Sequence, residues 1–225
     1  MQLRSQFPLK LFEQIQSCGI IAVLVIDEVR HAVPLAKALL DGGINVMELT
    51  LRTPVALEAL QAIRREVPEM VAGIGTILTP AQVDQVAQVG AAFGVAPGLN
   101  RRVMQQSQAL DLPFAPGIAT PSEVEAAVEL GCRDLKFFPA EPTGGVAYLS
   151  SLNAPYAHLG LRYIPLGGLN FENFISYLSL PFVPAVGGSW IAPRKAIQDE
   201  QWEVITSNAT ESRRLIDAQN FGDAT

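Results

Sequence analysis

The sequence predicts an α/β fold, a closed (β/α)8 TIM barrel with a short N-terminal leading helix, on the basis of three observations. Eight apolar strand-like stretches alternate with helix-like stretches, which favours parallel strands joined by helical crossovers. The length of 225 residues is near the lower end of the range usual for eight such units. No G-x-G-x-x-G motif follows the first strand, where an open doubly wound sheet would carry it. We therefore expect one barrel domain over residues 1–225, with the open sheet as the alternative.

The individual elements are predicted from apolar periodicity and from the glycine, proline and capping residues at their ends. The strands are expected at residues 20–26, 45–50, 71–76, 92–96, 113–118, 134–138, 162–165 and 182–186. A leading helix over residues 10–17 is expected to close one end of the fold. The helices that follow the strands are expected at residues 27–42, from 53 onward, 79–90, 101–110, 121–130, 145–154, 170–178 and 193–217.

Composition and charge limit the classes of partner. The net charge is −6 and the arginines are dispersed without a basic block, which argues against nucleic acid. The longest apolar run has nine residues, well short of the roughly twenty needed to cross a bilayer, so no membrane partner is expected. Cys18 and Cys132 are too few and too far apart for a disulfide framework, which indicates free thiols in a reducing compartment. These features predict a cytoplasmic protein.

Lys136 is the first candidate for chemistry, because it alone of the four lysines lies inside a strand-like run. Burying an unpaired ammonium costs several kcal/mol unless the group turns neutral, and the neutral amine is the form that attacks a carbonyl. We therefore interpret Lys136 as a nucleophile that forms a Schiff base with a keto acid. The competing interpretation is a side chain whose stem packs in the strand while its ammonium reaches water.

Side-chain alternation directs a carboxylate toward the same interior. The bulky apolar neighbours of Glu48 suit the helix-packed face of the barrel, so Glu48 is expected to face inward. The same alternation turns Lys136 and Phe138 inward, so Lys136 and Glu48 are expected to converge. A carboxylate beside an amine nucleophile can transfer protons. The competing interpretation of Glu48 is a structural ion pair with Arg52.

Further candidates follow the third, seventh and eighth strands, at the ends where barrels place their sites. Thr76 offers a hydroxyl after two glycines, which allow a close approach of the backbone to a ligand; its alternative role is helix entry. Gly167-Gly168 and Gly187-Gly188-Ser189 occupy loops that often hold a phosphate on backbone N–H groups and a helix N-terminus. The alternative is two ordinary glycine turns.

Other catalytic constellations are not supported by the sequence. No metal-ligand spacing is present, and His31 and His158 have no carboxylate or thiolate partner nearby in the sequence pattern. Both histidines are expected at the surface. Ser189 has no His/Asp constellation, which argues against a hydrolase triad.

With these motifs, the chain resembles the 2-keto-3-deoxy-6-phosphogluconate (KDPG) and 4-hydroxy-2-oxoglutarate (KHG) aldolase family from about residue 19 to the final helix. The resemblance is found in residues 46–53, 73–76, 96–98 and 135–141 and in the two glycine loops. The most specific are the lysine-containing segment and Glu48-x-Thr50-x-Arg52, whereas the glycine pairs alone are weak.

The resemblance implies a homotrimeric class I aldolase of TIM-barrel fold that needs no metal or other cofactor. Its substrates would be KDPG, cleaved to pyruvate and glyceraldehyde 3-phosphate, or KHG, cleaved to pyruvate and glyoxylate. Lys136 would form the Schiff base and Glu48 would act as general acid/base. The implied substrate-binding residues are Arg52 and Thr76 at the keto-acid carboxylate, Pro97 and Phe138 along the pocket, and Gly167, Gly168, Gly188 and Ser189 at the phosphate.

Two positions depart from the family pattern. Relatives often read Pro-Thr-Gly-Gly after the seventh strand, where this chain has Leu166 in place of threonine. A hydrogen bond to a charged phosphate, worth about 1.5–3 kcal/mol, is then missing. Some members also carry a basic residue where this chain has Val25. We therefore expect the enzyme to accept short or unphosphorylated 2-keto acids relatively well.

Three other functions stay open at this point. A sister aldolase for the galactonate-derived isomer of KDPG would use the same residues. A phosphate-binding barrel isomerase would form no imine, and a catalytically silent barrel would bind a keto acid or a protein partner without turnover. The sequence does not indicate the C4 stereochemistry of the substrate.

Overall fold

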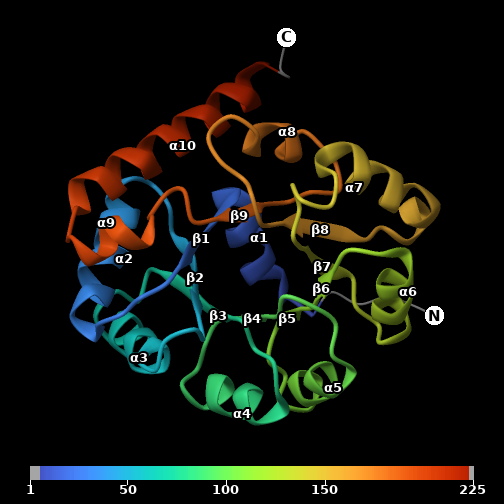
Figure 1. The fold of residues 1–225 in the computed structure, drawn as a ribbon, viewed down its shortest axis with the longest axis horizontal. Coiled ribbons are helices and arrows are strands. Elements are labelled where there is room, and N and C mark those ends of the chain that lie inside the picture. The colour runs from blue at the N-terminus through green and yellow to red at the C-terminus, as the bar shows by residue number, and fades with distance from the viewer. Residues whose placement is uncertain (1–5, 223–225) are drawn as a thin grey trace.

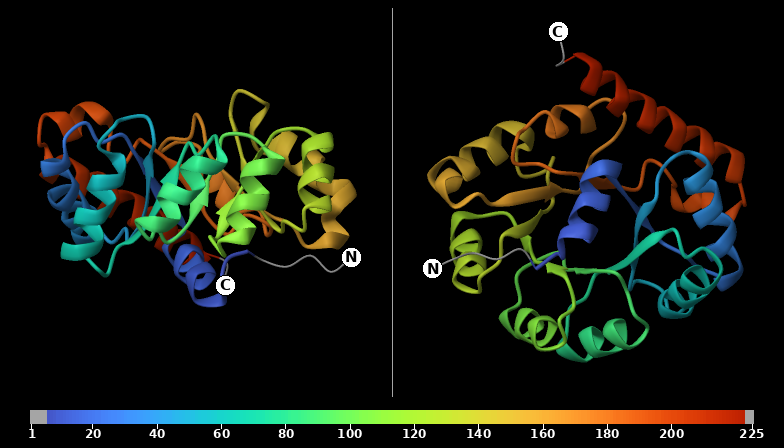
Figure 2. Two further views of the ribbon diagram at one scale, coloured as in Figure 1. Left: turned by 90° about the horizontal axis from the view of Figure 1, so that it is seen from below. Right: turned by 180° about the vertical axis from the view of Figure 1, so that it is seen from behind.

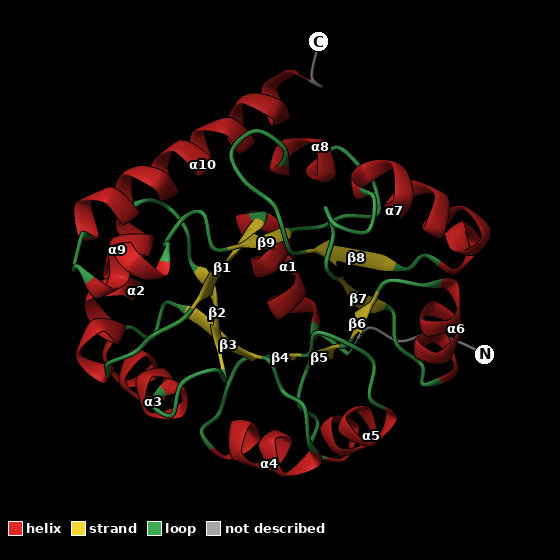
Figure 3. Ribbon diagram, in the orientation of Figure 1, coloured by secondary structure: helices red, strands yellow, loops and turns green. Residues whose placement is uncertain are grey.

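The computed structural model describes residues 6–222, and the side chains of residues 6–219, as a ring of short strands surrounded by helices (Figures 1 and 3). The strands are β1 (Ile20–Leu24), β2 (Val46–Thr50), β3 (Val71–Gly75), β4 (Gly94–Val95), β5 (Phe114–Ala115), β6 (Gly117–Ile118), β7 (Asp134–Phe137), β8 (Arg162–Pro165) and β9 (Val186–Gly188). Each strand-to-strand pairing is parallel, as the alternation of strands and helices predicts.

The helices lie outside the ring. They are α1 (Leu9–Cys18), α2 (Ala32–Asp41), α3 (Ala56–Glu66), α4 (Pro80–Gln88), α5 (Arg101–Ala109), α6 (Pro121–Glu129), α7 (Gly145–Asn153), α8 (Phe174–Leu178), α9 (Arg194–Gln198) and α10 (Trp202–Gly222), with 3-10 turns η1 (Val29–His31) and η2 (Ala154–Leu159). An exception to this placement is α1, which lies across one end of the ring and closes it, as predicted (Figure 2). Among the described helices, none is both long and apolar enough to span a bilayer.

The prediction of one uninterrupted eight-stranded barrel is met only in part. Backbone pairing forms a six-stranded sheet in the order β5-β4-β3-β2-β1-β9 and a three-stranded sheet in the order β6-β7-β8. The predicted strand at residues 113–118 is divided at Pro116, whose missing N–H cannot continue a ladder. Between β8 and β9 the connection is a single bridge from Leu166 to Gly187.

Other predicted elements also need correction. The helices expected from residues 53 and 170 begin only at Ala56 and Phe174. The strand expected at residues 182–186 begins only at Val186 and includes two glycines, because Pro184 has no N–H to donate. The long final helix is two helices, α9 and α10, separated by a turn at Glu200, which has a left-handed backbone (φ 54°). Asp27 does not cap a helix; its carboxylate instead accepts hydrogen bonds from Arg194 and Gln198 of α9.

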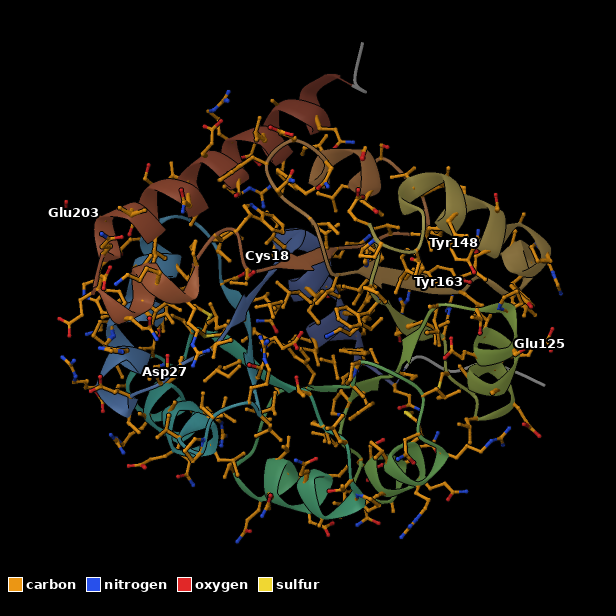
Figure 4. All side chains as sticks on the ribbon, in the orientation of Figure 1. Cys18, Asp27, Glu125, Tyr148, Tyr163 and Glu203 are labelled. Atoms are coloured by element: carbon orange, nitrogen blue, oxygen red, sulfur yellow. The ribbon has the colours of Figure 1, made fainter. Side chains whose placement is uncertain are left out.

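The core fills both the ring and the layer between strands and helices (Figure 4). The largest fully buried side chains come from both halves of the chain and include Phe93, Phe114, Phe137, Tyr163 and Tyr177. At the closed end, Phe7 and Ile15 are buried below the ring, and the ring of Phe12 stacks on the Arg162 guanidinium at 3.6 Å. The opposite end, where the strands' C-termini lie, therefore remains available for a ligand.

Candidate active site

A cavity of about 340 Å³ opens at the C-terminal ends of the strands. Its lining is Val23, Glu48, Thr50, Arg52, Thr76, Pro97, Lys136, Phe138, Leu166, Gly167, Gly168, Leu169, Gly188 and Ser189. All ten predicted site residues are in this set, although they come from segments spread over more than half of the chain. The ring brings them together because parallel strands all end on the same side.

Lys136 and Glu48 meet at the bottom of the cavity. Nζ of Lys136 donates a hydrogen bond to Oε1 of Glu48 at 3.3 Å. Glu48 is 2% and Lys136 6% exposed, and Lys136 is the one buried residue among the four lysines, all of which lie in the described range. The Phe138 ring centroid is 5.5 Å from Nζ. The predicted convergence of Lys136 and Glu48 is confirmed, and the amine of Lys136 pairs with a buried carboxylate rather than extending to the protein surface.

Strand register accounts for this meeting. In the six-stranded sheet, Glu48 of β2 lies between Val23 of β1 and Gly73 of β3. In the three-stranded sheet, Lys136 of β7 lies between Gly117 and Ile164. Each charged group therefore extends from a central position of its own sheet, and the two side chains span the interior to reach one another.

The glycines before Thr76 make room for protein side chains rather than for a ligand. A Cβ on Gly73 would lie 2.4 Å from the Phe93 ring, and a Cβ on Gly75 would lie 1.7 Å from Oε1 of Glu48. The expectation that these glycines admit a ligand is corrected accordingly. Gly75 is a residue that the sequence analysis did not connect to Glu48.

Arg52 stands at the rim of the cavity with an orientation fixed by Thr50. Its Nε donates to Oγ1 of Thr50 at 3.1 Å, and that hydroxyl donates to the carbonyl of Leu24 at 3.0 Å. No carboxylate among the described residues lies within 4.0 Å of the Arg52 guanidinium, whereas Glu48 pairs with Lys136. The alternative of a Glu48–Arg52 ion pair is therefore wrong, and Arg52 is free to receive an anionic ligand.

Thr76 lines the cavity in a strained conformation. Its φ is 62°, in the left-handed region that is a true outlier for a β-branched residue. The next helix is capped by Thr79, which forms a capping box with Gln82, so Thr76 is not needed as the helix cap. Such strain is concentrated at functional sites, where the surrounding structure holds it in place.

The two glycine loops form the opposite wall, which we call the glycine end: Gly167, Gly168, Gly188 and Ser189. Gly167 and Gly168 have φ angles of 96° and 86°, which favour glycine and leave only their backbone facing the cavity. The helices that follow are only five residues long, α8 starting at Phe174 and α9 at Arg194. The glycine end thus offers backbone groups and the Ser189 hydroxyl, without the helix N-terminus expected from the sequence.

Some lining residues were missed by sequence reasoning. Thr50 is not among them, because alternation placed it on the same inward face as Glu48, and it lines the cavity. Val23 sits in a continuous apolar run, which carries no signal for which side chain reaches a cavity. Leu169 follows Gly168 in a loop, where no periodicity applies.

The histidines lie outside the cavity. His158 is exposed as predicted, whereas His31 is only 2% exposed because it packs 6.0 Å from the Trp202 ring, with Nε2 3.3 Å from Oε1 of Glu200. The surface prediction for His31 is wrong. Within residues 6–222, no group of three or more His, Cys, Asp or Glu side chains is arranged to hold a metal. Cys18 and Cys132 are buried free thiols, as expected.

Comparison with known proteins identifies the family. The family model for KDPG and KHG aldolases matches residues 11–208. The 2-dehydro-3-deoxy-phosphogluconate aldolase of Dickeya dadantii is 41% identical over 89% of this chain and 93% of its own. The KHG/KDPG aldolase of Escherichia coli strain K12 is 40% identical over the same shares.

A solved relative has the same fold. The crystal structure of KDPG aldolase from Legionella pneumophila, with pyruvate captured at low pH as a covalent carbinolamine intermediate, superimposes with a TM-score of 0.84. It is 39% identical, and the match covers 88% of this chain and 96% of that one. With a buried lysine–carboxylate pair in an open cavity and these matches over nearly its whole length, the chain belongs to the KDPG and KHG aldolase family of carbon–carbon lyases.

Proposed function

We propose that this aldolase cleaves KDPG, KHG or both through a Schiff base on Lys136, with Glu48 as general acid/base. The observation that carries the proposal is the buried 3.3 Å contact between the Lys136 amine and the Glu48 carboxylate inside the cavity. A nucleophilic amine needs an adjacent group that takes and returns protons, and this pair meets that need. The carbinolamine formed by pyruvate in the Legionella pneumophila relative supports the same chemistry here.

Arg52 and Thr76 suit the carboxylate of the keto acid. The Arg52 guanidinium can form a charge-assisted hydrogen bond with a carboxylate, and such bonds are roughly twice as strong as neutral ones. Its hydrogen bond to Thr50 fixes the direction from which it meets the ligand. Thr76 adds a hydroxyl from the neighbouring strand. Pro97 and Phe138 line the cavity between these groups and the glycine end.

The proposed reaction begins with the transfer of the ammonium proton of Lys136 to Glu48. The neutral amine attacks the C2 carbonyl to give a carbinolamine. Glu48 then returns its proton to the carbinolamine hydroxyl, which leaves as water and yields a protonated imine. Glu48, through a water molecule, accepts the proton of the C4 hydroxyl while the C3–C4 bond breaks and its electron pair moves to the iminium nitrogen. The aldehyde leaves, C3 of the enamine takes the proton back from Glu48, and water hydrolyses the imine to pyruvate and free Lys136.

The glycine end receives the part of the substrate that becomes the aldehyde. Backbone groups of Gly167, Gly168 and Gly188 and the hydroxyl of Ser189 suit the phosphate of KDPG, because a phosphate accepts several hydrogen bonds at once. Leu166 lines the same region without a hydroxyl, which favours unphosphorylated substrates such as KHG. Both C4 epimers belong in the assay, because the galactonate-derived isomer would use the same lysine.

The proposal extends to the closed barrel, the oligomeric state and the cellular compartment. We infer that the nine strand segments act as a (β/α)8 barrel in which β5 and β6 are two halves of one strand, supported by the bridge from Leu166 to Gly187. The resemblance to the family supports a homotrimer, and the absence of a disulfide between the buried thiols suits the cytoplasm. Light scattering during size-exclusion chromatography tests the trimer.

The decisive experiment is intact mass spectrometry after incubation with pyruvate and borohydride. Wild type should gain one reduced pyruvate adduct that peptide mapping assigns to Lys136, and Lys136→Ala should gain none. Lys37→Ala, which removes an exposed lysine, is the matched control and should be labelled like wild type. A folded wild-type protein without adduct would refute the imine mechanism and favour a barrel isomerase.

A further inference from the structure

We propose that Trp190 is a positioning residue that sets the separation of the two glycine loops, and thereby the fit of the phosphorylated part of the substrate. The inference rests on the proposed function, in which the glycine end holds that part. Trp190 does not line the cavity. Its effect would be exerted through Gly188 and Ser189, which do.

The Trp190 side chain folds back over its own loop. A Cβ on Gly188 would lie 2.0 Å from Cζ3 of Trp190, so the indole covers the outer side of Gly188 at close range. Only glycine fits beneath the ring. Ser189, at the tip of this turn, is exposed and lines the cavity.

The same indole contacts the segment that continues the other glycine loop. The rings of Phe174 and Trp190 are 5.4 Å apart at an interplanar angle of 31°, and the Phe171 ring meets Trp190 edge-on at 6.5 Å. Asn173, next to Phe174, donates from Nδ2 to the carbonyl of Gly168 at 3.2 Å. A continuous path therefore leads from Gly168 through the start of α8 to Trp190 and Gly188.

Helix α10 holds the indole and its backbone from the third side. Nε1 of Trp190 donates to Oγ of Ser212 at 3.4 Å, and Ser212 is fully buried. Nδ2 of Asn208 donates to the carbonyls of Ile191 at 3.1 Å and Trp190 at 3.5 Å. With α8, α10 and Gly188 around it, the ring has one place to lie, and the loop it belongs to is fixed with it.

The test compares substrates that differ at the glycine end. Trp190→Ala should raise KM for KDPG by about tenfold, the effect of losing one hydrogen bond to a charged group, while KM for KHG and the rate of pyruvate trapping by borohydride stay unchanged. Trp190→Phe, which keeps an aromatic ring against Phe174, should recover most of the KDPG affinity. Trp202→Phe, at the only other tryptophan, should match wild type on both substrates.

A structural role alone predicts a different pattern. If Trp190→Ala changes both substrates equally, or neither, the proposal is overturned. Should Trp190→Ala fail to fold, Ser212→Ala removes the acceptor of the indole N–H, together with a hydrogen bond to the Asn208 carbonyl within α10. It should raise KM for KDPG selectively to a smaller extent, and equal effects on both substrates would again overturn the proposal.

A second measurement does not require turnover. In the Trp202→Phe variant all tryptophan emission comes from Trp190, and titration with glyceraldehyde 3-phosphate should change that emission to saturation. A flat titration would contradict the proposal even for an active enzyme. Failure of the proposed function is distinguishable, because wild type would then form no borohydride adduct.

Discussion

The side chain of Leu166 lies against the backbone of Gly187, where a Cβ would be 2.7 Å from Cδ2 of Leu166. Leu166 is 4% exposed and lines the cavity beside the glycine end. At this position a hydroxyl group would face the phosphorylated part of a substrate, whereas the leucine side chain presents only an apolar group.

Leu166→Thr should therefore shift substrate preference. The new hydroxyl should raise the ratio of kcat/KM for KDPG over KHG by about tenfold or more, while the lost apolar volume should lower the free energy of unfolding by about 2 kcal/mol. Steady-state kinetics on both substrates measures the ratio. Leu166→Val is the control, because valine has the shape of threonine without its hydroxyl, and it should leave the KDPG-to-KHG ratio unchanged. If Leu166→Thr also left the ratio unchanged, the missing hydroxyl would not explain the substrate preference.

Gly75→Ala should displace the Glu48 carboxylate, because the methyl group would occupy its present position. We expect the free energy of unfolding to fall by about 1–3 kcal/mol. The rate of aldol cleavage should fall by about 10²-fold or more, the lower range for loss of a general acid/base. Gly98→Ala is the control, since its Cβ would meet no atom within 4 Å. Equal activity in the two variants would show that Glu48 does not depend on Gly75.

Thr76→Gly should separate stability from activity. The left-handed conformation costs a non-glycine residue roughly 1–2 kcal/mol in the folded state, and glycine relieves that cost. Glycine also raises the entropy of the unfolded chain, which lowers the free energy of unfolding by up to about 1 kcal/mol. The midpoint of urea unfolding should therefore hold or rise, while kcat/KM for keto acids falls with loss of the hydroxyl. Asp111→Gly relieves a similar φ of 51° outside the cavity and should keep full activity. A destabilised Thr76→Gly variant would contradict the strain.

Alkaline pH should destabilise the fold. Burial, followed by nearby Asp134, raises the pKa of the Cys132 thiol to about 12. Burial also raises the pKa of Tyr163 and of Tyr177, the latter with a further contribution from its bond to Glu141. The unfolded chain loses these protons near pH 9–10, whereas the folded chain retains them. The unfolded state then binds fewer protons, so the free energy of unfolding falls as pH rises from about 9 to 12.

Urea titrations across this pH range measure the slope, and Tyr163→Phe tests its origin. The Tyr163 hydroxyl is buried without a hydrogen-bond partner in the described structure, so its removal should raise stability by about 1 kcal/mol. The variant should also show a shallower alkaline decline than wild type. A decline that stays unaltered in both Tyr163→Phe and Cys132→Ala would assign it to other groups.

Local sequence signals were sufficient for two helices that begin with Thr-Pro, although the helix expected from residue 53 begins only at Ala56. Thr79-Pro80 and Thr120-Pro121 each begin a helix with a capping box, because side chain and backbone satisfy one another within four residues. The break at Glu200 carries no such signal, since its left-handed backbone occurs in a residue with no preference for it. The start of β9 was misplaced although a local signal was present, since Pro184 cannot donate to a strand ladder and argues against a strand at residues 182–185.

For the site, alternation along two strands was enough to bring Lys136 and Glu48 together. It was not enough to show what surrounds them. Two features depend on side-chain positions between strands: Gly75 makes room for Glu48, and Thr50 orients Arg52. His31 was misplaced for the same reason: its partner Trp202 belongs to the last helix, whose packing no local pattern reports.

The division of the strands into two sheets has a consequence for how activity is distributed along the chain. Glu48, Arg52 and Thr76 belong to the six-stranded sheet and its loops, whereas Lys136 extends from the three-stranded sheet. A cut at Pro116 would leave the carboxylate on one fragment and the amine on the other. Neither fragment would hold a complete reactive pair, so catalysis would return only when the two fragments reassociate.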